Sequence, residues 1–180
     1  MNYLVVFNTI IVLVGFATIN IAFYTNQWVF DDGDVRGLVP YTKGANGTYF
    51  GTVCILMYTA YSLYWIATFL IILANVKIIT KNAEMKSAKI PYIASLILFL
   101  AVAGLIIAAF VVTCQYVYQI PSYIKRRFPV GNKPHVKPGY SAYLGLVSAA
   151  VSLVNGGFCL FTVICGIKKS GGGSGGEDWR

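Results

Sequence analysis

The sequence contains little charge. Only 11% of its 180 residues are Asp, Glu, Lys or Arg, whereas 57% are hydrophobic. A soluble domain carries about 25% charged residues. A soluble fold of this length cannot hide so much apolar surface, so lipid must cover part of it. The composition therefore excludes a soluble protein and predicts membrane lipid as a partner.

No charged residue occurs in the first 30 positions. Residues 4–24 form an apolar run there that would measure about 31 Å as a helix, which matches the core of a bilayer. Nothing basic precedes this run, and it is too long for the apolar part of a signal peptide, so a retained helix is predicted. Further apolar runs occupy 52–76, 90–116 and 140–167. The sequence thus predicts an all-α membrane protein, a bundle of four transmembrane helices.

The chain also lacks the residues on which most enzymes and metal sites depend. Its one histidine, His135, lies among Pro and Lys residues. There is no metal-binding Cys/His spacing, no phosphate-binding loop and no nucleophile beside a base. No charged residue falls within an apolar run, which argues against an ion pathway through one copy. We therefore expect no enzymatic activity and no cofactor. The residues that give the net charge of +8 lie outside the apolar runs. Basic residues in such segments set topology or meet lipid headgroups, so we do not expect binding to nucleic acid.

The predicted loops are 25–51 and 117–139, with a basic connector at 77–89. Counts of Lys and Arg do not settle which side each segment faces. The glycosylation sequon Asn46-Gly47-Thr48 favours an outward position for the two loops, although the sequon could be unused. The expected location is therefore the plasma membrane, with several passes and both termini cytoplasmic. Residues 170–180 begin SGGGSGG, which has the composition of an engineered linker, and they are left out of the functional argument.

Cysteine is sparse, with four in the chain. Cys54 and Cys114 fall near the outward ends of their runs, where they are either free thiols or a disulfide pair. Cys165 lies close to Lys168 at the membrane boundary and is a candidate for palmitoylation.

Small residues in the last two runs predict close helix packing, because helices in lipid associate where their backbones can approach. The candidate packing positions are Gly104 and Ala108, then Ser141, Gly145 and Ala149, and finally Ser148, Ser152 and Gly156.

Two charged clusters in the loops are candidates for partner binding. Asp31, Asp32 and Asp34 crowd into four positions but lack the twelve-residue spread of an EF-hand loop, which favours a solvated acidic turn over a calcium site. Lys125, Arg126 and Arg127 are consecutive, and Lys133 and Lys137 follow. This second cluster is either simply solvated or recognises an acidic surface on a partner or on a neighbouring copy.

The order of motifs along the chain resembles the claudin superfamily, which includes claudins, the peripheral myelin protein group and calcium-channel gamma subunits. Asn26-Gln27-Trp28-Val29 follows the first run, and Gly37-Leu38 comes nine residues after Trp28, as in the first loop of that family. Ser87-Ala88-Lys89 ends the connector, Ala103-Gly104-Leu105 lies in the third run, and Tyr140-Ser141-Ala142-Tyr143 opens the fourth. Val39 stands where the family has a second tryptophan, and its two first-loop cysteines are absent.

The resemblance implies a small extracellular cap, with room for short β-strands, that contacts other membrane proteins at cell junctions or in membrane organisation. The alternative that it implies is an auxiliary subunit packed beside an ion channel or receptor. Trp28, Gly37 and Leu38 would then belong to the contact region. We expect Trp28 to anchor the first loop at the membrane surface, where indole rings are favoured.

Overall fold

A computed structural model describes residues 2–25, 27–31, 34–36, 38, 48–81, 85–127 and 136–171. The helices are α1 (Asn2–Tyr24), α2 (Thr48–Lys81), α3 (Met85–Arg127) and α4 (Tyr140–Gly171). The strands are β1 (Val29–Asp31), β2 (Asp34–Arg36) and β3 (Val136–Pro138). Each helix contains an apolar stretch long enough to cross a membrane: Val5–Tyr24, Gly51–Ile78, Lys89–Tyr118 and Tyr140–Ile164. The predicted bundle of four transmembrane helices is therefore confirmed.

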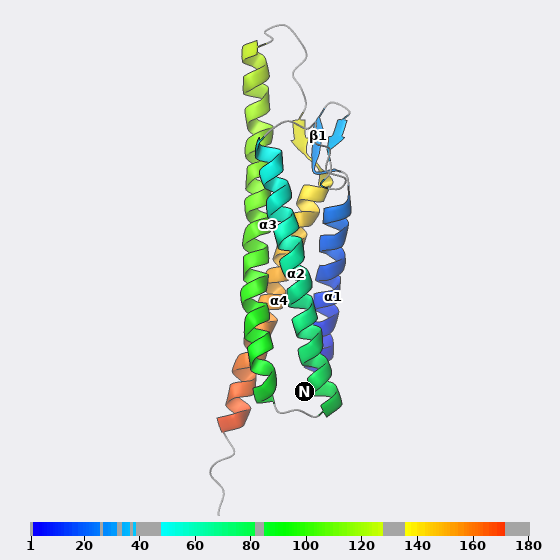
Figure 1. Cartoon of the computed structure of the whole chain (residues 1–180), viewed down its shortest axis with the longest axis vertical. Coiled ribbons are helices and arrows are strands. Elements are labelled where there is room, and N and C mark those ends of the chain that lie inside the picture. Colours follow the sequence, from blue (N-terminus) through cyan, green and yellow to red (C-terminus); the bar gives the residue numbers. More distant parts are fainter. Residues whose placement is uncertain are drawn as a thin grey trace, which may run out of the picture.

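The helices run alternately up and down in a ring, in which α1 packs on α2, α2 on α3, α3 on α4 and α4 on α1. The start of α1 and the end of α4 lie at one end of the bundle, here called the terminal end, and the strands lie at the other, the sheet end (Figure 1). Helices suit this setting because lipid offers the backbone no hydrogen bonds. The many exposed Ile, Leu, Val and Phe side chains along the four helices form the surface that lipid covers.

The helix ends differ from the predicted ones. Apolar runs mark the thickness of the membrane, whereas a helix continues for as long as its residues permit. The largest difference is in α3, which extends to Arg127 and carries Lys125, Arg126 and Arg127 on its last turn. The prediction of a loop starting at residue 117 is therefore wrong for 117–127. Basic residues at the C-terminal end of a helix interact favourably with its dipole, which is one reason for the extension.

The strands form a three-stranded antiparallel sheet in the order β2-β1-β3. Two residues separate β1 from β2, the shortest common hairpin connection. Asp31 pairs with Asp34 across this hairpin, and Phe30 pairs with both Val35 and Lys137. The first loop and the segment before α4 are thus joined in one cap.

The small residues of α4 lie inside the bundle. Ser141, Ser148 and Ser152 are fully buried, and Ala149 is nearly so. A Cβ on Gly156 would lie 3.3 Å from Leu96 of α3. The same expectation is wrong for α3 within a single copy. Among the described residues, nothing from another part of the chain lies within 4 Å of where a Cβ on Gly104 would be, and Ala108 is exposed. Helix rotation decides which small residues face inward, and the spacing alone does not give that rotation.

Candidate functional site

Trp28 lies immediately before β1, at the sheet end of the bundle, and is completely buried, with 0% of its surface exposed. Its indole Nε1 donates a hydrogen bond of 2.8 Å to the carbonyl oxygen of Ala22 in the last turns of α1. Its ring also reaches α4, where a Cβ on Gly145 would lie 3.2 Å from Cη2 of the indole. The ring therefore fills the space between α1 and α4. The prediction that Trp28 contacts a partner is wrong, because its side chain lies inside the protein.

Several hydrogen bonds join the segment between α1 and β1 to the start of α4. The amide of Gly139 donates to the carbonyl of Trp28 at 2.9 Å, and the amide of Ser141 donates to the carbonyl of Gln27 at 3.1 Å. The Ser141 hydroxyl lies 2.6 Å from the Thr25 hydroxyl and accepts from the amide of Gln27 at 3.3 Å. These five residues, Thr25, Gln27, Trp28, Gly139 and Ser141, are called the joint below.

From the sequence, Ser141 was predicted to contribute to helix packing. Thr25, Gln27 and Gly139 were not predicted as site residues. A glycine between a strand and a helix often marks a close backbone approach, and Gly139 occupies such a position. A Cβ there would lie 1.8 Å from the carbonyl oxygen of Gln27. The position of Gly139 between a strand and a helix was therefore the feature of the sequence that could have identified it.

Leu38 makes a second attachment between the cap and the bundle. It is also completely buried, and its carbonyl oxygen accepts a bond of 3.4 Å from the Tyr58 hydroxyl of α2. The Tyr58 ring packs edge-on against Phe23 of α1, with centroids 4.8 Å apart. Like Trp28, Leu38 is a structural residue of the cap, and its predicted contact with a partner is wrong.

The charged candidates occupy the outer parts of the sheet end. Asp31 and Asp34 are opposite one another at the end of the hairpin, and Lys137 of β3 is exposed. The basic residues 125–127 lie at the tip of α3, which rises past the sheet in Figure 1. Asp32, Gly37 and Asn46 fall outside the described residues. Thr48 of the glycosylation sequon is the first residue of α2.

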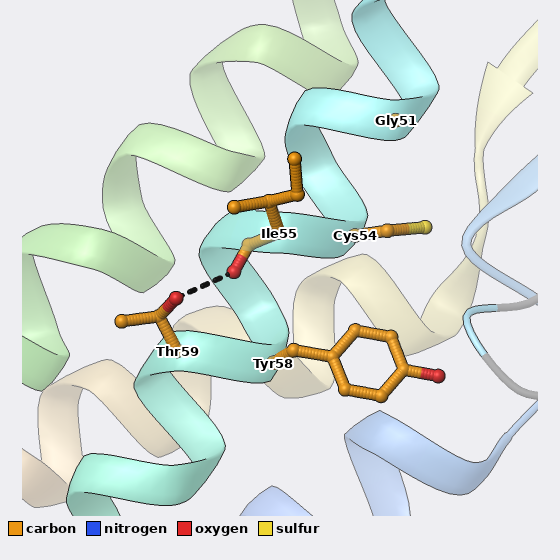
Figure 2. A pocket seen from close by; sticks show the side chains of 5 residues that line it. All are labelled: Gly51, Cys54, Ile55, Tyr58 and Thr59. Atoms are coloured by element: carbon orange, nitrogen blue, oxygen red, sulfur yellow. Dashed lines mark hydrogen bonds between the residues drawn. The ribbon is translucent and has the colours of Figure 1, made fainter.

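An open groove of about 570 Å³ lies along one face of α2 near the sheet end, lined by Gly51, Cys54, Ile55, Tyr58 and Thr59. In Figure 2 the Cys54 side chain points away from α3, and the Thr59 hydroxyl bonds to the Ile55 carbonyl at 2.8 Å. Cys54 and Cys114 are both free thiols, so the disulfide alternative is wrong. The side chain of Cys165 is outside the described part. No group of three His, Cys, Asp or Glu residues suited to a metal ion occurs among the residues that the structure describes.

Comparison with known families agrees with this arrangement of four spans and a cap. The sequence model of the family described as "Tight junction protein, Claudin-like" matches residues 1–166. The match includes all of the strands and all four apolar spans. A comparison with curated proteins finds no match. The chain therefore belongs to the claudin-like family of tight junction proteins.

Proposed function

We propose that this protein is a non-enzymatic membrane protein that contacts other membrane proteins through its sheet end, at cell junctions or in membrane organisation. The joint is the observation that carries the proposal. It fastens a small sheet to two helices through backbone hydrogen bonds and a buried indole ring. A binding surface held in place in this way loses little conformational freedom when a partner binds.

The charges of the sheet end support a partner with complementary charge. Asp31 and Asp34 are paired in the antiparallel register, so two acidic residues occur together at the end of the hairpin. A partner with positive charge would complement them. Residues 119–127 carry α3 about 13 Å beyond its apolar span at 1.5 Å per residue, which places Lys125, Arg126 and Arg127 well outside the lipid. A second copy of this chain offers both complementary charges.

Changing Lys125, Arg126 and Arg127 together to Ser is expected to weaken association with the partner. Association of the unchanged protein should itself fall as salt rises, because the screening length shrinks from about 8 Å at physiological ionic strength to about 3 Å at 1 M. Recovery of the partner in a pull-down across a salt series measures both effects. A variant with Lys77→Ser and Lys89→Ser, which removes charge at the terminal end, is the control and should behave as the unchanged protein does. Equal recovery from the triple variant at every salt concentration would contradict the proposal.

Charge reversal distinguishes a second copy from a different partner. One variant carries Asp31→Lys and Asp34→Lys, and the other carries Glu in place of Lys125, Arg126 and Arg127. If copies bind one another through these charges, each variant alone should associate poorly, and a mixture of the two should recover association. A mixture that recovers nothing, while each variant alone loses binding, would point to a different protein as the partner.

The proposed orientation has the sheet end outside the cell and both termini in the cytoplasm. Lys137 and Lys77 are exposed at opposite ends of the bundle. An amine reagent that cannot cross membranes should therefore modify Lys137 on intact cells and leave Lys77 unmodified until the cells are opened. Mass spectrometry of the peptides reads out both sites. Modification of Lys77 on intact cells would reverse the orientation.

The role of an auxiliary subunit beside a channel is the second candidate. One observation favours it: Gly104 and Ala108 of α3 face away from the bundle, where they leave room for a helix from another protein to approach. Copurification separates the two candidates. Assembly of the chain with itself favours the first, and recovery of a larger channel in fixed proportion favours the second.

A further inference from the structure

The bundle contains a buried polar layer near its terminal end. The Asn75 side chain of α2 donates through Nδ2 to the Thr9 hydroxyl of α1 at 2.7 Å and accepts through Oδ1 from the Tyr92 hydroxyl of α3. Cys159 of α4 lies near Tyr92. All four helices thus contribute to this layer, which is uncharged.

Asn8 of α1 belongs to the same layer but has no hydrogen bond of its own. Only 1% of its surface is exposed, and neither its Nδ2 nor its Oδ1 has a partner among the described residues. The Tyr92 hydroxyl is a neighbour of the Asn8 side chain, but the two do not form a hydrogen bond of acceptable geometry. Burying an amide without a hydrogen bond destabilises the folded protein. Lipid cannot reduce that cost, because its chains neither donate nor accept.

The layer lies close to the surface of the membrane. Asn8, Asn75 and Tyr92 are each three residues from the end of their apolar span, at Val5, Ile78 and Lys89 respectively. Three residues of helix measure about 5 Å. A small molecule that enters from the terminal end therefore has less than one helical turn to cross before it reaches the layer.

We infer that Asn8 and Tyr92 hold ordered water inside the bundle. Water is the smallest molecule that can accept from the Asn8 Nδ2 and donate to its Oδ1. The Tyr92 hydroxyl uses its proton on Asn75 and keeps lone pairs that can accept from the same water. Internal waters in proteins make about three such bonds each. The water would link α1 to α3 directly, across the bundle.

The test measures transfer of nuclear magnetisation from water to the protein, with the full chain in lipid bilayers. The Asn8 side-chain amide should receive magnetisation from water. The backbone amide of Val12, one turn deeper and fully buried, should receive none and serves as the internal control. The Asn8→Leu variant keeps the size of the side chain but has no donor or acceptor. It should abolish the transfer to the Tyr92 hydroxyl as well.

Two results would contradict the inference. A resolved Asn8 amide signal that receives no magnetisation from water would overturn the inference. So would transfer to Tyr92 that persists undiminished in Asn8→Leu, because that water would not depend on Asn8. If Asn8→Leu does not fold, the measurement on the unchanged chain still decides, since it needs only the Asn8 and Val12 signals.

Discussion

Replacing Trp28 with Ala is expected to lower the free energy of unfolding by about 3–5 kcal/mol, the usual cost of truncating a buried aromatic residue. The variant would leave a cavity between α1 and α4, because the indole reaches the backbone of Gly145. It would also leave the Ala22 carbonyl without its donor. Thermal unfolding of the purified protein in detergent measures the loss, and delivery to the cell surface should fall with it.

The Trp28→Phe variant separates the ring from its hydrogen bond. Phe keeps an aromatic side chain in the cavity but has no N–H, so it should cost about 1–3 kcal/mol, the penalty for one unsatisfied buried acceptor together with a partly filled site. The expected order of stability is the unchanged protein, then Phe, then Ala. An Ala variant that unfolds at the same temperature as the unchanged protein would show that Trp28 does not hold the cap.

The Gly139→Ala variant is expected to break the joint. The added methyl group would lie 1.8 Å from the Gln27 carbonyl oxygen and 2.5 Å from its carbon. These are backbone atoms, so no side chain can turn aside to make room. The amides of Gly139 and Ser141 would lose their acceptors, at about 1 kcal/mol for each hydrogen bond.

Hydrogen exchange locates this effect. The amides of Gly139 and Ser141 should exchange faster in Gly139→Ala, while the amides in the middle of the four helices should stay protected. Gly104→Ala is the matched control, because no described part of the chain outside its own helical turns lies within 4 Å of the added group. It should leave exchange at Gly139 and Ser141 unchanged and should not lower stability, because Ala favours a helix more than Gly does. Unchanged protection of Gly139 and Ser141 in the Gly139→Ala variant would mean that the close approach to Gln27 is not required.

The sequence predicted the four helices well because the bilayer imposes a minimum apolar length, and that length is visible in a single chain. It predicted the helix ends poorly. Beyond the membrane, a helix ends where capping and turn residues stop it, and Lys125, Arg126 and Arg127 allow α3 to continue. The disulfide alternative was left open because the direction of a side chain such as Cys54 depends on helix rotation.

The candidate site shows the same limit at the level of single residues. Trp28 stood out in the sequence, but a tryptophan at a helix end can lie on the membrane surface or inside the protein. Its surroundings include Gly145, a residue of the fourth helix, and no local pattern reveals that contact. Gly104 and Gly145 are both glycines in membrane helices, yet only Gly145 packs against another part of the chain.

The pairing of β1 with β3 has a consequence for biosynthesis. β1 follows the first helix, whereas β3 immediately precedes the fourth. Synthesis must therefore proceed past α3 before the central strand of the sheet can acquire its second neighbour. Gly139 and Ser141 come later still, so the joint closes only when α4 is being inserted. A ribosome product that stops after α3 would display an unpaired strand edge and an unfilled place beside Trp28, which are features that quality control can detect.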